Sequence, residues 1–107
     1  MSQTQKPALG EQALCEELLK NVYDPEMGVN IVDLGLIRRI DVNNGIAEVE
    51  MTLTTPACPA GPALVQEVRQ RLASLKTIRE VEVKLVWSPP WTPEQMTEEA
   101  RDELGLF

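Results

Sequence analysis

The sequence contains no histidine, only two cysteines and few aromatic residues. Because histidine is the commonest general base and the commonest imidazole metal ligand, its absence excludes several classes of enzyme and metal site. Two cysteines in different contexts, Cys15 and Cys58, do not form a disulfide framework and are typical of a reducing compartment. No apolar run approaches the ~20 residues that span a bilayer, and residues 1–9 lack the apolar stretch of a secretion signal. We therefore expect a cytoplasmic protein.

Positive charge is also scarce. Ten Lys and Arg residues stand against seventeen Asp and Glu residues, which gives a net charge of -7. Nucleic acid and anionic membrane surfaces repel such a chain, so we expect neither as a partner. Its 107 residues, 43% of them hydrophobic, are enough for one compact domain with a modest core. The composition favours proteins as partners.

The first half of the chain predicts a helix followed by a β-hairpin. We expect residues 1–10 to form a flexible N-terminal arm, because they are polar and include a proline and a glycine, and residues 11–107 to form the domain. Apolar residues then recur at helical spacing: Leu14, Cys15, Leu18, Leu19 and Val22. Residues 36–42 and 47–54 indicate two strands, joined at Asn43-Asn44-Gly45 by a turn that tolerates positive φ.

The second half predicts a helix, a strand and a last helix. Apolar spacing indicates a helix at 64–75, and alternation indicates a strand at 81–87, reached by a parallel crossover. The last helix is expected to open at 92–95, with Thr92 as N-cap and Gln95 closing a capping box, and to stop at Gly105. The expected fold is a single small α/β domain of two layers, in the order α-β-β-α-β-α. Its three-stranded mixed sheet contains a β-hairpin and a parallel crossover.

Cys58 is the residue with the clearest chemical potential. It follows Thr54-Thr55-Pro56 between the end of a strand and the start of a helix, where free N–H groups and the helix dipole favour a thiolate. A thiolate is both a nucleophile and a soft-metal ligand. The alternative interpretation is a small buried apolar residue at a tight turn. Cys15, on the apolar face of the first helix, is interpreted as a core residue.

The loop before the first strand is acidic. Asp24, Glu26 and Asp33 are close enough in sequence to converge on a pocket. The structural interpretation is that Asp24 caps a turn opened by Pro25, and that Asp33 accepts hydrogen bonds from nearby backbone N–H groups. The sequence leaves both interpretations open.

Two tryptophans flank a stiff diproline in the segment Trp87-Ser88-Pro89-Pro90-Trp91. Proline cannot continue a sheet ladder, so this segment is expected to run extended beyond the third strand. We interpret Trp87 as a lid over the hydrophobic core. Trp91 is predicted to face either the Cys58 pocket or a partner protein, because exposed tryptophan is enriched in binding hot spots.

Five blocks of sequence together resemble the SufT/PaaD-like family of iron–sulfur cluster assembly factors: Asp24-Pro25-Glu26, residues 30–36, residues 51–56, Cys58-Pro59 and residues 89–93. The resemblance runs from about Leu14 to Gly105. It implies a small α/β domain, usually dimeric, that acts in the maturation of iron–sulfur proteins. Its reactive cysteine would fall on Cys58.

The resemblance also implies which residues surround the cysteine. Asp24, Glu26 and Asp33, together with Thr54 and Thr55, would line the same region. Ala57 departs from the family, which commonly has glycine before the Cys-Pro pair, and alanine demands a more ordinary φ. The expected partners are iron–sulfur scaffold and client proteins and a second copy of the chain.

Three functional hypotheses follow. In the first, Cys58 is a transient ligand of an iron–sulfur cluster or of iron. Four thiolates usually hold a cluster, so two subunits or a partner protein would complete the set. In the second, the domain is an adaptor that recruits client proteins without binding metal. The third, a thiol enzyme, is weak because the chain offers neither histidine nor a Cys-x-x-Cys pair. We expect no enzyme activity.

Overall fold

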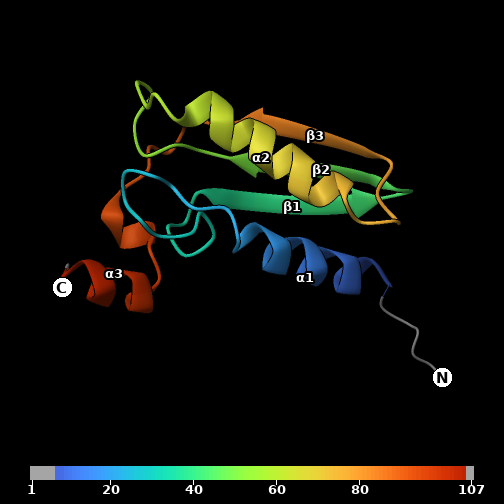
Figure 1. Ribbon diagram of the computed structural model, residues 1–107, viewed down its shortest axis with the longest axis horizontal. Coiled ribbons are helices and arrows are strands. Elements are labelled where there is room, and N and C mark those ends of the chain that lie inside the picture. Colours follow the sequence, from blue (N-terminus) through green and yellow to red (C-terminus); the bar gives the residue numbers. More distant parts are fainter. Residues whose placement is uncertain (1–6, 106–107) are drawn as a thin grey trace.

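The computed structural model describes residues 7–105, which form a three-stranded sheet and its helices (Figure 1). The strands are β1 (Ile37–Asn43), β2 (Ile46–Met51) and β3 (Glu80–Leu85), in the spatial order β1-β2-β3. β1 and β2 run antiparallel, whereas β2 and β3 run parallel. The expected mixed sheet, with its β-hairpin and parallel crossover, is confirmed.

The hairpin turn follows from its sequence. Asn44 and Gly45 connect β1 to β2, and both have positive φ, 52° and 80°. Two consecutive residues in this region make the turn whose twist matches that of the flanking strands. The turn fixes the register of β2, so that Ala47 and Val49 are buried while Glu48 is exposed.

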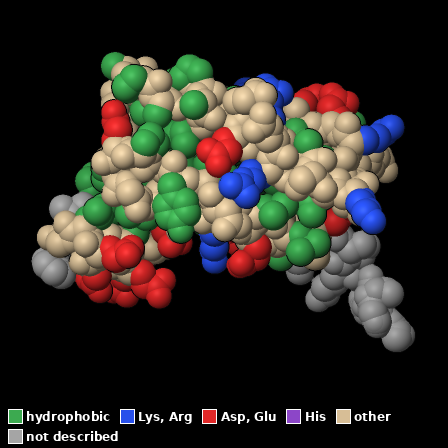
Figure 2. All heavy atoms as spheres, viewed as in Figure 1, with side chains coloured by type: hydrophobic (Ala, Val, Ile, Leu, Met, Phe, Trp, Pro, Cys, Tyr) green, Lys and Arg blue, Asp and Glu red, His purple; other side chains and the backbone are tan. Residues whose placement is uncertain are grey.

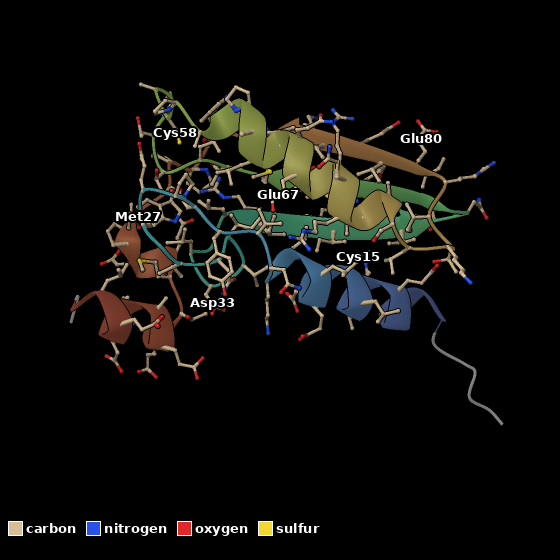
Figure 3. The ribbon with its side chains drawn as sticks, in the orientation of Figure 1. Cys15, Met27, Asp33, Cys58, Glu67 and Glu80 are labelled. Carbon is tan, nitrogen blue, oxygen red and sulfur yellow. The ribbon has the colours of Figure 1, made fainter. Side chains whose placement is uncertain are left out.

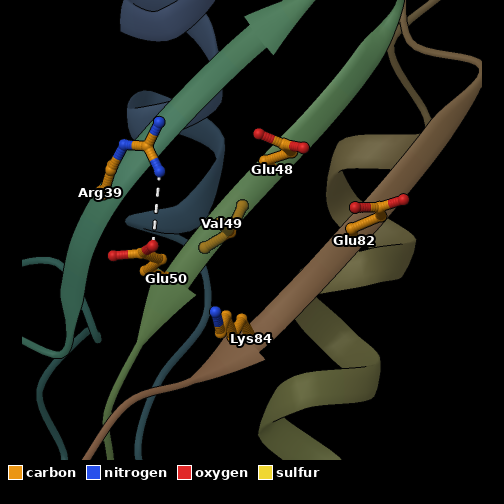
Figure 4. A pocket seen from close by; sticks show the side chains of 6 residues that line it. All are labelled: Arg39, Glu48, Val49, Glu50, Glu82 and Lys84. Carbon is orange, nitrogen blue, oxygen red and sulfur yellow. Dashed lines mark hydrogen bonds and ion pairs between the residues drawn. The ribbon is translucent and has the colours of Figure 1, made fainter.

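Two helices form the second layer. α1 (Pro7–Leu19) packs against β1, α2 (Gly61–Ala73) packs against β3, and the two helices contact each other. Their inner faces bury four leucine and valine residues completely or almost so: Leu19, Leu64, Val68 and Leu72. The other face of the sheet carries charged side chains from all three strands (Figure 4). With α3 (Glu98–Leu104) at the end, the predicted order α-β-β-α-β-α is confirmed.

The start of α1 differs from the prediction. The helix begins at Pro7, before the start of the domain expected at residue 11. Proline suits the first turn because its missing N–H would have no partner there, and Gly10 weakens a helix without breaking it. Residues 1–6 of the predicted arm lie outside the described residues. Leu14 is 55% exposed and so does not join the apolar face, whereas Cys15 is fully buried.

The end of the chain also differs. Residues Pro93–Gln95 form only a short 3-10 turn, labelled η2, and α3 begins after it at Glu98. Thr92 makes no capping hydrogen bond, whereas the Thr97 hydroxyl accepts one from the Ala100 N–H at 3.2 Å. Met96 is the reason, because it is extended and buried and so interrupts the helix. The predicted stop at Gly105 is confirmed by its φ of 75°.

Acidic side chains gather over α3 in the space-filling view, and apolar ones gather where α2 begins (Figure 2). The acidic residues of α3 are Glu98, Glu99, Asp102 and Glu103. Between residues 7 and 105, no helix is long and apolar enough to cross a membrane.

Candidate functional site

Cys58 lies in the connection between β2 and α2 (Figure 3). Its N–H donates to the carbonyl oxygen of Thr55 at 3.1 Å, and the Ala57 N–H donates to the hydroxyl of Thr55 at the same distance. The Cys58 carbonyl oxygen in turn accepts from the N–H of Gly61, the first residue of α2, at 3.1 Å. Backbone hydrogen bonds on both sides thus hold the cysteine in place. Thr54 is half-buried and takes no part in these hydrogen bonds.

The side chain of Cys58 lines an apolar groove of about 520 Å³. The other residues of the groove come from the β2–α2 connection, from α2 and from the end of β3: Leu53, Pro56, Gly61, Pro62, Val65, Leu85 and Trp87. Cys58 itself is only 6% exposed, whereas Leu85 and Trp87 are 37% and 44% exposed. Large exposed apolar side chains usually mark a contact surface rather than a core. We refer to these eight residues as the Cys58 groove.

Gly61 allows the groove to be this tight. A Cβ at this position would come within 2.8 Å of Leu53 Cδ1, which is closer than real Cβ atoms approach. The absence of a side chain lets the first turn of α2 pack directly on Leu53. The start of α2 therefore lies directly against Leu53 at the groove.

Asp24 holds the turn at the start of the acidic loop. Its side chain is fully buried, and Oδ1 accepts hydrogen bonds from the N–H groups of Glu26 and Met27 at 2.8 and 3.3 Å. The predicted capping of the turn at Pro25 is therefore confirmed. The second oxygen, Oδ2, is buried and has no hydrogen-bond partner among residues 7–105. Glu26 is exposed.

Asp33 joins the loop to the C-terminal segment. Its Oδ2 accepts a hydrogen bond from Asn30 Nδ2 at 3.0 Å, and its N–H donates to Asn30 Oδ1 at 2.9 Å. Its carbonyl oxygen accepts from the Thr97 N–H at 2.9 Å. The described residues contain no group of three carboxylate or thiol side chains placed to hold a metal ion. The structure therefore does not assemble Asp24, Glu26 and Asp33 with Cys58 into one ligand set, and their roles at the site stay predictions.

The environments of the two tryptophans are the reverse of those predicted. Trp87 lines the Cys58 groove and is 44% exposed, so its interpretation as a lid over the core was wrong. Trp91 is half-buried against the core, and its Nε1 donates to the Leu34 carbonyl oxygen at 2.7 Å. Trp91 does not line the groove. A role for Trp91 in partner binding stays a prediction.

Cys15 is a core residue, as predicted, and its side chain is fully buried on the inner face of α1. Burial raises the pKa of its thiol, and the neighbouring carboxylate of Glu11 raises it further. A thiol that holds its proton more tightly is a poorer nucleophile and metal ligand. Of the two cysteines, only Cys58 lines the groove.

The sequence pattern missed the wall of the groove. Leu85 belongs to the alternation of β3, and because the strand ends beside α2, its side chain is 37% exposed. Val65 and Pro62 appeared only as helix residues. The one signal that could have found them is that Cys58, the start of α2 and the end of β3 must meet at the same edge in a strand-helix-strand crossover.

Comparison with known proteins identifies the family that this sequence matches. The model of a family described as iron–sulfur cluster assembly protein matches residues 13–85. This span contains Cys58, all three strands and both long helices apart from the first turns of α1. The family match thus covers the fold and the groove up to Leu85.

Characterised relatives and a solved structure agree with this match. The chain is 43% identical over 100 residues to the Fe-S protein maturation auxiliary factor YitW of Bacillus subtilis, covering 90% of this chain and 98% of that protein. It is 44% identical over 86 residues to the auxiliary factor SufT of Staphylococcus aureus, covering 79% and 98%. A crystal structure of a domain of unknown function from Bacillus anthracis superimposes with a TM-score of 0.88 at 34% identity, covering 94% and 96%.

Proposed function

This chain belongs to the family of iron–sulfur cluster assembly proteins, and from that premise we propose that it is an auxiliary factor in the maturation of iron–sulfur proteins. The two relatives named as maturation factors support this function, because nearly the whole of each aligns with the chain. The resemblance inferred from five sequence blocks is confirmed by the same matches. Iron or an iron–sulfur cluster would be the cargo of such a factor.

The observation that carries a more specific role is the position of Cys58. It is the one thiol in a surface groove, and its backbone is held by hydrogen bonds on both sides. A thiolate at this position would bind iron of a cluster as one ligand of the usual four. The remaining ligands would come from a scaffold protein, a client protein or a second copy of the chain. An incomplete ligand set leaves positions that can exchange, which suits transfer.

The apolar wall of the groove would serve that transfer. Leu85 and Trp87 are partly exposed beside the thiol, so a partner that covers them would bury apolar surface and exclude water from the cargo. Exclusion of water strengthens the interaction between a thiolate and a metal ion. Because tryptophan is a frequent hot spot, Trp87 is the residue whose loss should weaken partner binding most.

A second candidate function is an adaptor that recruits client proteins without binding metal. The low exposure of Cys58, 6%, favours this alternative, because a ligand of a transferable cluster must be accessible when the partner is bound. The adaptor would use the same groove as an apolar contact surface. The two functions therefore differ in whether the thiol is needed.

We further propose that the protein is not an enzyme and acts in the cytoplasm, where scaffold and client proteins are its partners. Apart from the thiol, the residues that line the groove carry no titratable side chain, so none of them can serve as a base for Cys58. This supports an auxiliary role over the thiol-enzyme hypothesis.

Anaerobic reconstitution with iron and sulfide tests the role of Cys58. We expect visible absorption of a cluster in the wild-type protein, and its loss together with the bound iron in Cys58→Ser. Cys15→Ala is the matched control, because it also removes one thiol but from the core, and it should keep the absorption. If Cys58→Ser retains the full iron content, Cys58 is not a ligand. If neither the wild type nor any variant binds iron, while Trp87→Ala loses affinity for a client protein, the adaptor function is supported.

A further inference from the structure

The outer edge of β3 is open. β3 pairs with β2 on one side, and nothing among residues 7–105 pairs with the other. The N–H groups of Glu80 and Val86 both donate towards β2, at 3.2 and 2.8 Å, and the register between them is unbroken. Because backbone groups alternate along a strand, the N–H and C=O groups of Val81, Val83 and Leu85 point outwards. A hydrogen bond from α2 confirms this direction: Arg69 Nη1 donates to the Val81 carbonyl oxygen at 3.3 Å.

The side chains of β3 alternate as well. Glu82 and Lys84 lie on the open face of the sheet, beside Glu48 and Glu50 of β2 (Figure 4). Val81 and Val83 are half-buried on the helix face, and Leu85 reaches the Cys58 groove. Neither Glu82 nor Lys84 forms an ion pair within the described part of the chain. Besides the Val81 carbonyl oxygen, which already accepts from Arg69, the edge offers the Val81 N–H and the backbone groups of Val83 and Leu85, one apolar row and one charged row.

We propose that this edge binds the same edge of a second copy of the chain, antiparallel, about a two-fold axis at Val83. In that register Val83 faces Val83 of the second copy, and the two residues exchange both backbone hydrogen bonds. Glu82 faces Lys84 of the second copy, and by symmetry Lys84 faces its Glu82. Val81 faces Leu85 on the helix side in the same way. The result is one continuous sheet of six strands with its helices on a single face.

The charges select this register among those that pair the outward groups of β3. An axis at Val81 places Glu80 against Glu82 twice, and an axis at Glu82 or Lys84 places that residue against its own copy. Like charges directly opposite each other destabilise a strand pair, whereas opposite charges stabilise it. An axis at Leu85 brings no charged pair together. Only the axis at Val83 forms two opposite-charge pairs and no like-charge pair.

This dimer has a consequence for cargo handling, which rests on the proposed function. Figure 3 shows Cys58 at the end of the molecule towards which β3 runs, opposite Glu80. A two-fold axis at Val83 therefore places the two Cys58 residues at opposite ends of the joined sheet. The two Leu85 residues, one in each groove, would be four strand residues apart, about 13 Å. The two thiols could not ligate one cluster, so each groove would share its cargo with a scaffold or client protein.

Sedimentation equilibrium of the full-length apo protein, from about 1 μM to about 1 mM, tests the interface, since a single strand pair makes a small and weak contact. We expect reversible dimerisation of the wild type. Glu82→Lys and Lys84→Glu each create two like-charge pairs and should raise the dissociation constant about tenfold or more. The double variant restores opposite charges in reversed order and should recover dimerisation. Glu48→Lys makes the same charge change on β2, away from the edge, and should dimerise like the wild type.

Val83→Pro gives a second line of evidence. It removes an outward N–H and leaves the hydrogen bonds to β2 intact, so circular dichroism should show a folded protein and sedimentation equilibrium should show a monomer. A wild type that stays monomeric up to about 1 mM, or single variants that dimerise as well as the wild type, would overturn the proposal. So would a double variant that fails to recover. Because apo protein is used, these outcomes are independent of whether Cys58→Ser loses iron, and either proposal can fail without the other.

Discussion

Gly35 should be one of the least replaceable residues outside the groove. It has a φ of 82°, and a Cβ at this position would lie 2.3 Å from the carbonyl oxygen of Gln95. That oxygen belongs to the backbone of η2 and cannot rotate away. The close approach occurs where the C-terminal segment is held by the Trp91 indole on Leu34 and by the Thr97 N–H on Asp33. A side chain at Gly35 would therefore push this segment away from the loop.

The cost of Gly35→Ala has two parts. Holding alanine in the left-handed region costs about 1–2 kcal/mol. Forcing the segment to shift costs about 1–3 kcal/mol more, by analogy with overpacked cores. We expect a loss of about 2–5 kcal/mol in the free energy of unfolding, measured by urea denaturation. The slope of the denaturation curve should stay unchanged if only the native packing is affected.

Gly28→Ala is the matched control. Gly28 has a similar φ of 72°, but nothing lies within 4 Å of its Cβ position. It should show only the backbone cost of about 1–2 kcal/mol. The difference between the two variants isolates the contact with Gln95. Equal losses in both variants would refute the argument that the C-terminal segment packs tightly on the loop at Gly35.

Two further predictions concern α3 and the core. Thr97→Ala removes the observed cap of α3 and should lower the free energy of unfolding in urea by about 1 kcal/mol. Thr92→Ala should lower it by less than about 0.5 kcal/mol, because Thr92 makes no capping bond. A larger loss for Thr92→Ala than for Thr97→Ala would show that Thr92 is the cap. Burial raises the pKa of Cys15 above its ordinary 9.0, so the neutral thiol stabilises the fold below that pH, and this contribution is lost as the pH rises through the raised pKa. The wild type should therefore lose stability above about pH 9 more steeply than Cys15→Ala; equal slopes would contradict this.

Much of the fold was predictable because its signals are local. Apolar residues three and four apart gave the two long helices, strict alternation gave β2, and Asn44-Gly45 gave the turn of the hairpin. The errors lie at the ends of elements. Thr92 and Thr97 both precede acidic residues that favour a helix start, and the sequence could not show that burial of Met96 would keep the first of them out of the helix.

The candidate site was predictable in part. A single cysteine between a strand and a helix, in a chain without histidine, identified Cys58, and five blocks of sequence indicated the family that the comparisons confirm. The surroundings of Cys58 were harder to predict. The groove joins Pro62 and Val65 of α2 to Leu85 and Trp87 at the end of β3, which are about twenty residues later in the chain.

The sequence by itself determined the order of the elements, the register of the hairpin and the position of a cysteine between a strand and a helix. These depend on periodicity, on turn conformation and on composition, each of which acts over a few residues. The tertiary structure decided that Trp87 is exposed at the groove while Trp91 is held by Leu34, a residue 57 positions away. It also decided that the Asp24 side chain, whose cap the sequence allowed, is fully buried. Both outcomes depend on which distant surfaces meet when the apolar faces are buried, and no local pattern encodes that choice.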